Sequence, residues 1–507
     1  MTKIFSAIFL IVITFTAKGQ TTEKNRRTAV EELIETYISV SIDPYRGTTK
    51  AAWDKQAEEL LNRIDNATGS DEFYYTLRYF GTLSNDGHFN FPDMGSYNRN
   101  KFFQKDDKLF PVLTRATQDD HVFVVRDYSG LIPDYAELIQ INGKNVKELS
   151  HQQHILLPYE PNYAYAHLNE VEELSFRAWP SFANYLFCEK IQGPFTVEYA
   201  IDGITKTATI NAMERQELHK KSKSMRKFNF PFYGKVIDYT RHNDSIAVLD
   251  IDSFWGKNPF MFLFSKNDKR FERTLKRNMK KVNRDGIRHL VVDIRSNAGG
   301  YAKNVYELMS YFAPDMVYDN RQTYKISAMS KEKDRGARIV NNSIQMIHGK
   351  NNKELREQTV EIYKSMPEGA IFRDDTLLSM AYSVEKPKYS YQGNVYVLTN
   401  STSFSASTIF CNYFRKSGVG MIAGSSPAGY SKVTGGARIP ARHWLTQFFP
   451  MRIPHILNNP LQEEGYQYIV PDIPIENDFD YWVKGEDNRL AKLLHMIASP
   501  QYDTPDN

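Results

Sequence analysis

The sequence NSTSFSASTIFCNYFR, residues 400–415, is typical of a corner between a strand and a helix. It follows the apolar run Val395-Tyr-Val-Leu, which is typical of a buried strand, and its second half has apolar residues at helical spacing that end at Gly418. A corner of small residues between a strand and a helix exposes a side chain and points free backbone N–H groups at the same place. A serine there can attack a carbonyl while these N–H groups stabilise the oxyanion. Serines are also common helix caps, so this stretch alone does not separate the two interpretations.

The length and composition of the chain indicate a multidomain globular protein. A chain of 507 residues is too long for one compact core and predicts two to four domains. Its 31 Tyr and 31 Phe residues favour ample cores and extended surfaces that could hold a peptide. A formal net charge of +4 is too small to indicate a nucleic-acid-binding protein.

Residues 1–20 have the pattern of a secretory signal peptide. Lys3 is followed by an apolar stretch from Ile4 to Ala17 and then by small and polar residues. The apolar stretch is short for a membrane span, and an uncleaved anchor is the alternative. We therefore expect a protein exported to the periplasm or the extracellular space, with no membrane span after cleavage.

The cysteines and histidines do not predict a metal site. Cys188 and Cys411 could form a disulfide in an exported protein, but Cys411 falls in an apolar helical stretch, so two buried thiols are the favoured interpretation. His151 and His154 could share a metal only with a third ligand, which the sequence does not supply nearby. We expect no metal or organic cofactor, and the oligomeric state stays open.

The first half of the chain divides into a helical and a β-rich part. Residues 22–105 are predicted to be helical, in the simplest case a three-helix bundle, because apolar residues repeat at helical spacing. Within this part, His88 lies in a polar turn that opens onto an alternating strand, where its side chain would be presented rather than buried. Residues 106–212 are predicted to be β-rich, with hairpin turns at Asn142-Gly and Asp202-Gly. This part resembles a PDZ domain, which implies binding of extended peptides by strand addition.

The second half is predicted to be an α/β core. From Ser245 onward strands alternate with helices, so residues 213–495 are expected to form a sheet covered by crossover helices. Residues 315–392 are charged and helical in pattern, and we expect them to be a helical insertion. The predicted fold class is therefore α/β and multidomain.

Three segments of this core together resemble the carboxyl-terminal processing, or tail-specific, serine peptidases and their tricorn-core relatives. Asp293-Ile-Arg-Ser-Asn-Ala-Gly-Gly is similar to the family's Asp-Leu-Arg-x-Asn-x-Gly-Gly. Ser405-Ala-Ser-Thr is similar to Ser-Ala-Ser-Glu, whose first serine is the nucleophile, and Val470-Pro-Asp-Ile is similar to the closing strand. The resemblance extends over nearly the whole mature chain. It implies a crotonase-like peptidase core that acts on protein or peptide substrates without a cofactor.

The sequence departs from the processing peptidases at the general base. Their lysine is replaced here by Tyr430, and Lys432 lies two residues further on. The tricorn-type branch uses instead an earlier histidine and a later glutamate, and His88 and Glu464 match these positions. The spacing leaves Glu463 as an alternative to Glu464.

The resemblance to the tricorn-core-like branch thus implies a Ser405, His88 and Glu464 site. Ser405 Oγ would attack the peptide carbonyl, His88 would move its proton and Glu464 would orient the imidazole. The backbone N–H of Ala406 and a second backbone N–H, from one of the glycines of the Asp293 motif, would form the oxyanion hole.

The second N–H of the oxyanion hole would come from Gly299 or Gly300, because glycine lets the backbone approach a reacting atom closely. Asp293 and Arg295 are expected to stabilise the fold rather than to act in catalysis.

Two alternatives stay open. The chain could be an inactive relative that binds peptides through its PDZ-like part and cleft, since Tyr430 and Thr408 replace a lysine and a glutamate of the family. It could also use a dyad of Ser405 and Lys432. Cleavage specificity, and whether the site is preformed or awaits a domain movement, do not follow from the sequence.

Overall fold

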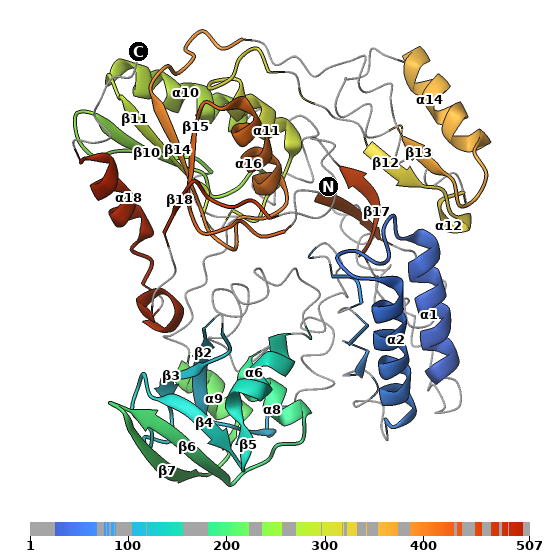
Figure 1. Cartoon of the computed structure of the whole chain (residues 1–507), viewed down its shortest axis with the longest axis vertical. Helices are drawn as coiled ribbons and strands as arrows, with labels where there is room; N and C mark the ends of the chain where they lie inside the picture. Colours follow the sequence, from blue (N-terminus) through green and yellow to red (C-terminus); the bar gives the residue numbers. More distant parts are fainter. Residues whose placement is uncertain are drawn as a thin grey trace, which may run out of the picture.

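The computed structural model places helices and strands along most of the chain (Figure 1). The residues that it describes are 26–67, 73, 76–77, 79–80, 83–85, 87, 104–117, 119–154, 156, 181–222, 236–255, 270–295, 297–316, 318, 322–331, 341, 353–373, 386–429, 433–438, 452–458, 468–475, 479–484 and 486–499. The predicted signal peptide lies outside these residues, so export stays a prediction.

Two helices begin the described chain, α1 (Arg26–Val40) and α2 (Lys50–Asp65). Thr49 caps α2, because its side chain accepts a hydrogen bond from the N–H of Ala52. The two helices pack through stacked rings, with Tyr37 and Trp53 centroids 6.1 Å apart. The third predicted helix is described only at single residues, so the three-helix bundle stays a prediction.

The β-rich part contains a sheet with the strand order β2-β3-β4-β6-β7. These strands are β2 (Val112–Ala116), β3 (Val122–Asp127), β4 (Glu137–Ile141), β6 (Phe195–Ile201) and β7 (Ile204–Ile210). Around it lie β1 (Lys108–Leu109), β5 (Lys144–Asn145), β8 (Met213–Glu214), α6 (Val146–His154), α8 (Phe182–Cys188) and α9 (Arg215–Lys221). Both predicted hairpins are present, and Asn142 and Asp202 each have a positive φ followed by a positive-φ glycine, as tight hairpin turns require.

The α/β part is built on a six-stranded sheet with the order β18-β15-β14-β11-β10-β9. Its strands are β9 (Asp238–Arg241), β10 (Ile246–Asp250), β11 (His289–Asp293), β14 (Asn394–Thr399), β15 (Gly420–Gly424) and β18 (Ile473–Pro474). All neighbours pair in parallel except β9 and β10. The carboxyl ends of β11 and β14 therefore lie side by side, and the two candidate motifs follow these two ends.

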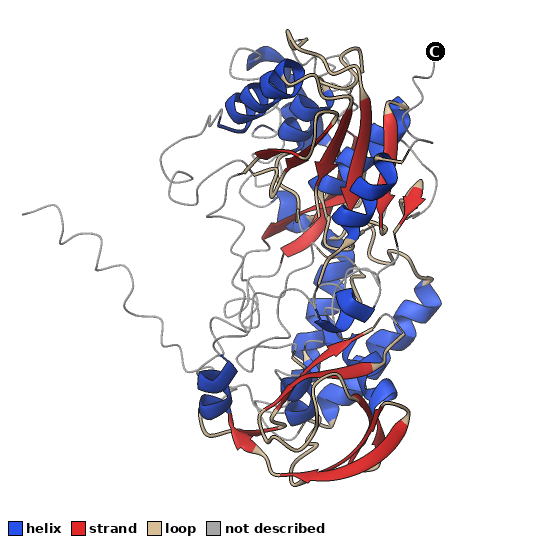
Figure 2. Cartoon of the chain, turned by 90° about the vertical axis from the view of Figure 1, so that its left-hand side faces the viewer, coloured by secondary structure: helices blue, strands red, loops and turns tan. Residues whose placement is uncertain are grey.

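Helices cover both faces of this sheet (Figure 2). One face packs on α10 (Arg270–Arg284), α11 (Ala302–Met309) and α16 (Ala406–Ser417), and the other packs on α18 (Arg489–Ile497). Successive residues of a strand point to opposite faces, so Ala247 and Leu249 enter the first core while Ile246 and Val248 enter the second. Burial on both faces explains why these strands are continuous apolar runs.

The helical insertion predicted for residues 315–392 is wrong in part. The segment does contain α12 (Ala328–Lys331) and α14 (Lys353–Ser365), but also β12 (Gln322–Lys325) and β13 (Ile371–Arg373). These strands join β16 (Val433–Arg438) and β17 (Arg452–Asn458) in a separate four-stranded sheet. Strands of three and four residues are too short to give a periodic signal, and β17, the second partner of β12, lies far along the chain.

The mixed α/β, multidomain architecture predicted from the sequence is confirmed, whereas the PDZ-like and crotonase-like assignments stay predictions. Within the described ranges, no helix has the length and apolar character that crossing a membrane requires. Both cysteines are free thiols, with Cys411 buried and Cys188 only partly buried. Burial raises the pKa of the Cys411 thiol to about 12, so this thiol is not an ionised nucleophile at neutral pH.

Candidate active site

Ser405 lies at a strained corner between β14 and α16. Its φ of 59° and ψ of −111° are unusual for a residue other than glycine, and it occupies the position just before the first residue of α16. Such a backbone conformation persists only where the surrounding structure enforces it, and strained corners of this kind gather at functional sites. The side chain is partly exposed. The corner therefore presents a serine at the amino end of a helix, as the sequence predicts.

The neighbouring serines have structural roles instead. Ser403 Oγ donates to the carbonyl of Ile294 at 2.8 Å, and Ser407 Oγ donates to the carbonyl of Asn297 at 2.7 Å. Asn400 closes the turn before them, because its side-chain oxygen accepts from the N–H of Thr402 at 3.1 Å. These bonds tie the corner to the segment that follows β11. Ser407 therefore supports the turn rather than presenting a second nucleophile.

The turn after β11 that contains Gly299 and Gly300, here called the glycine turn, packs closely against this corner. Gly299 has a φ of +99°, and a Cβ built on it would lie 2.7 Å from Ser405 Cβ and 2.8 Å from the nitrogen of Ala406. Gly300 has a φ of +147°, and its Cβ would lie 2.3 Å from the nitrogen of Trp255. No side chain fits either position, so both glycines are required by close backbone approach.

The backbone N–H groups at this contact differ in their bonding. The N–H of Gly299 donates to Asn297 Oδ1 at 2.9 Å. Ala406 is the first residue of α16, where a backbone N–H has no partner within the helix. The structure thus brings Gly299 against Ser405 and Ala406, but the N–H of Gly299 is engaged within its own turn. Gly300, the next residue, packs against the backbone of Phe254 and Trp255.

Asn297 is the residue of this turn that sequence reasoning missed. It is fully buried, its Nδ2 donates to the carbonyl of Ile251 at 2.8 Å, and its own carbonyl accepts from the N–H of Phe404 at 3.0 Å. Asn297 therefore links the residue after β10, the glycine turn and the corner. The motif itself marks this position, but the links are to residues that only the fold brings near.

Thr408 acquires a role that its replacement of a family glutamate did not reveal. It is buried, and its Oγ1 donates to the carbonyl of Ala428 at 2.8 Å. An ionised carboxylate could not donate this bond. The N–H of Ala428 in turn donates to the carbonyl of Ser403 at 2.8 Å. The side chain of Thr408 thus holds the loop after β15 against α16, the helix that begins directly after Ser405.

The proposed partners of Ser405 lie outside the described residues. These are His88, Glu464 and its alternative Glu463, together with Tyr430 and Lys432 at the lysine position. The assignment of the general base and of the third member therefore stays a prediction from the sequence.

The α/β part of the chain matches a known family of peptidases. Residues 245–475 match the family profile described as peptidase family S41. This match includes both the glycine turn and Ser405. The chain is a serine-type peptidase. The match spans the α/β part and leaves out the β-rich part and α18, and a comparison with curated proteins gives no match.

Solved structures support the fold of this peptidase. It is similar to mature CPAF complexed with lactacystin, with 13% identity and a TM-score of 0.55 over 94% of this chain and 97% of CPAF. A second structure of mature CPAF gives 14% identity and a TM-score of 0.56 over 93% and 96%. At such identities the likeness shows the fold alone. The tricorn protease gives 13% identity and a TM-score of 0.36 over 94% of this chain and 36% of that chain.

Two histidines of the peptidase meet a carboxylate in the β-rich part. His154 Nδ1 lies 2.5 Å from Asp120 Oδ1, and His151 Nδ1 lies 3.1 Å from Asp120 Oδ2. Burial lowers the pKa of His154, against the opposing effect of Asp120. Within the described part of the chain no cluster of His, Cys, Asp or Glu side chains is suited to hold a metal. We interpret the three residues as a local tie between α6 and the turn before β3.

Asp250, at the end of β10, has a strongly shifted pKa. Burial, and then the carboxylates of Asp293 and Asp252, raise the pKa of Asp250 to about 7 from an ordinary value of 3.8. Between these two pH values the folded chain holds a proton that the unfolded chain has lost. The resulting stability is fully present below the unfolded pKa and is lost as the pH rises through 7.

Asp250→Asn should remove this pH dependence, because an amide cannot ionise. We expect the variant to be more stable than the wild type at pH 8 by up to about 1 kcal/mol, since water screens a carboxyl that is partly exposed. At pH 4.5 the two should unfold at nearly the same temperature. Thermal unfolding at both pH values checks this, and a stability difference independent of pH would contradict the shifted pKa.

Proposed function

We propose that the chain is an exported serine endopeptidase that cleaves protein or peptide substrates through a Ser405 acyl-enzyme, with His88 as the general base. The observation that carries the proposal is the strained corner at Ser405, held against Gly299 at a distance where not even a methyl group fits. A serine that served only as a helix cap would not need a positive φ or a glycine turn packed on it.

In the mechanism that we propose, Ser405 Oγ attacks the carbonyl carbon of the scissile bond while His88 accepts the hydroxyl proton. The C–N bond then breaks, His88 gives the proton to the leaving amine, and the acyl group stays on Ser405. A water molecule attacks the acyl carbon, again with His88 as base, and releases the second product. Glu464 orients the imidazole and stabilises its protonated form.

The oxyanion hole in this proposal uses the N–H of Ala406 and that of Gly300. The first residue of a helix has a free N–H aimed at its amino end, where a negative charge is also favoured by the helix dipole. Gly300 is preferred to Gly299, because the N–H of Gly299 already donates to Asn297 Oδ1. Each such donor typically contributes about 10²- to 10³-fold to turnover.

The β-rich part is proposed to hold an extended segment of the substrate, as a PDZ-like unit would. Its strand β7 forms one end of the described sheet, pairs with β6 and is exposed over most of its length. An edge strand can accept a further strand through its backbone groups. Export, a crotonase-like core and an N-terminal helical bundle belong to the same proposal and rest on the sequence.

The choice of general base should separate this proposal from its alternatives. His88→Ala is expected to lower kcat/KM for an unfolded protein substrate at least about 10³-fold, because no other group would accept the serine proton. Lys432→Ala should change it less than about threefold. Cleavage is measured with a fluorescence-quenched unfolded protein, after circular dichroism shows that both variants are folded.

Two other outcomes of this experiment would favour the two alternative functions. If Lys432→Ala loses cleavage while His88→Ala retains it, the general base is Lys432 and not His88, and the site is a dyad of Ser405 and Lys432. Binding of extended peptides without any cleavage by the wild type would identify an inactive peptide-binding relative.

A further inference from the structure

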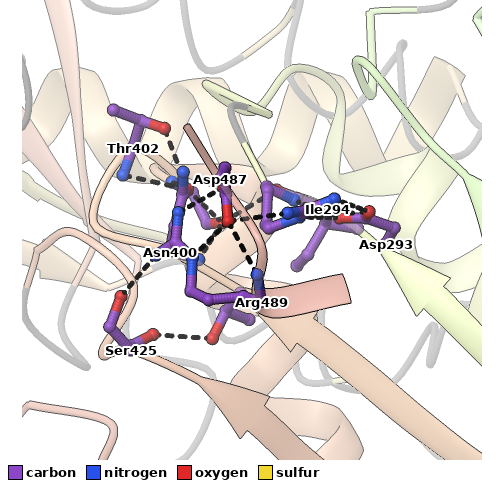
Figure 3. A network of polar contacts seen from close by, with 10 residues as sticks. Asp293, Ile294, Asn400, Thr402, Ser425, Asp487 and Arg489 are labelled. Atoms are coloured by element: carbon purple, nitrogen blue, oxygen red, sulfur yellow. Dashed lines mark hydrogen bonds and ion pairs between the residues drawn. The ribbon is translucent and has the colours of Figure 1, made fainter. Parts of the chain in front are cut away.

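A chain of alternating charges connects Asp293, at the end of β11, to Asp487 and Arg489 in the C-terminal segment (Figure 3). Arg295 donates from Nη2 to Asp293 Oδ2 at 2.7 Å and pairs through Nη1 with Asp487 Oδ1 at 3.0 Å. Arg489 donates from Nε to the same Asp487 oxygen at 2.8 Å, and its Nη1 reaches Ser425 Oγ at 3.1 Å. Two carboxylates and two guanidinium groups thus form one continuous network.

The network joins the segments that build the site. Asp293 and Arg295 begin the motif that ends in the glycine turn. Ser425 begins the loop after β15, and its carbonyl accepts a hydrogen bond from Thr399 Oγ1 at 2.8 Å, at the end of β14 just before the corner. Asp487 Oδ1 contacts both Arg295 and Arg489 and so bridges the two arginines. The C-terminal segment therefore connects the start of the motif that contains the glycine turn to the loop after β15 and, through Ser425, to the end of β14.

These charges are buried enough to fix geometry. The Arg489 side chain is 1% exposed and that of Asp293 is 5% exposed, while Arg295 is 16% and Asp487 is 29% exposed. Removing one partner of a buried pair leaves the other charge uncompensated, which is strongly unfavourable. The guanidinium fork also constrains direction as well as distance, which an ammonium group would not do. A change at Asp487 should thus shift its partners rather than leave them in place.

The C-terminal segment lies outside residues 245–475, which match the peptidase family. Its other end contacts the β-rich part through the π-helix η6 (Asp480–Lys484), visible in Figure 1 between α18 and β3. The ring centroids of Phe479 and Phe123 lie 5.2 Å apart, and Lys484 Nζ lies 6.0 Å from the centroid of the Tyr135 ring. The segment is thus anchored at both ends, and Asp487 and Arg489 form its anchor at the site.

We propose that Asp487 and Arg489 are positioning residues of the peptidase, which hold the glycine turn and the Ser405 corner in register for attack and oxyanion binding. The proposal rests on the proposed function of Ser405. Neither residue touches the substrate. Loss of either should therefore lower the rate of acyl transfer and leave substrate binding almost unchanged, since a misplacement of about 1 Å can cost on the order of 10²-fold in rate.

The test uses the full chain and the reaction of Ser405 with a small fluorophosphonate, whose rate depends on nucleophile and oxyanion hole and not on substrate binding. Asp487→Asn and Arg489→Lys are expected to lower this rate and kcat by about tenfold to a hundredfold, with KM changed less than about threefold. Arg489→Lys keeps the charge but cannot contact Asp487 and Ser425 with a planar fork.

A matched control separates positioning from loss of stability. Met279→Ala removes a fully buried side chain of α10 from the same α/β part and should cost about 2–5 kcal/mol of stability. At a temperature well below its unfolding midpoint it should keep kcat within about twofold of the wild type. If Asp487→Asn and Arg489→Lys also keep the labelling rate and kcat within twofold, the proposal is wrong. Failure of the wild type to label at Ser405 would instead overturn the proposed function, and the positioning proposal with it.

Discussion

Ser405→Ala is expected to abolish cleavage of an unfolded protein substrate, with kcat reduced by at least about 10⁴-fold. The substitution removes the one oxygen that forms the acyl-enzyme, while Ala406 N–H and the glycine turn stay in place. Because alanine can adopt the same strained φ as serine, the corner itself should persist. Any residual cleavage by this variant should come from substrate binding and oxyanion stabilisation alone.

Ser417→Ala provides the matched control for this variant. Ser417 ends the same helix α16, and its Oγ donates to the carbonyl of Phe414 at 2.6 Å. The two variants lose the same atom at opposite ends of one helix, so they should unfold within a few degrees of each other. Cleavage should be lost only in Ser405→Ala. Substantial cleavage by Ser405→Ala would show that Ser405 is not the nucleophile.

Gly299→Ala is the second variant with a large expected effect. The added methyl group would lie 2.7 Å from both the carbonyl oxygen of Phe404 and Ser405 Cβ, where no relaxation short of moving the backbone relieves the contact. The positive φ of Gly299 adds strain for any other residue. We expect kcat to fall at least about 10²-fold, because the corner and the glycine turn can no longer approach each other.

Gly418→Ala separates this steric effect from backbone strain. Gly418 ends α16 with a φ of +66°, but a Cβ there would meet nothing within 4 Å. Its substitution should cost about 1 kcal/mol of stability and leave kcat unchanged. Steady-state kinetics on both folded variants make the comparison. Equal activity of Gly299→Ala and Gly418→Ala would contradict the close approach on which the site depends.

The parallel strands and the corner could be predicted from the sequence because their signals are local. β10, β11, β14 and β15 are apolar runs bounded by polar or small residues, and Gly418 marks the end of the helix after Ser405. Side chains buried on both faces of a sheet give such runs without any knowledge of their partners. The same locality explains why both hairpin turns of the β-rich part were predictable.

What could not be predicted depends on contacts between distant segments. β12 pairs with β17 more than a hundred residues later, and neither short strand shows alternation strong enough to reveal the other. The same holds for Asp487, which meets Arg295 only because α18 covers the second face of the sheet. The sequence placed Ser405, Ala406 and the glycines together through a family resemblance, whereas His88 and Glu464 stay predictions of that resemblance.

The central claim is that Ser405 is the nucleophile, and the location of a covalent adduct tests it most directly. The wild-type protein would be treated with a fluorophosphonate, digested, and analysed by tandem mass spectrometry while loss of proteolysis is followed in parallel. We expect one phosphonyl group on Ser405, in step with the loss of activity. Inactivation with the adduct on any other residue, or full proteolysis by protein modified at Ser405, would contradict the account.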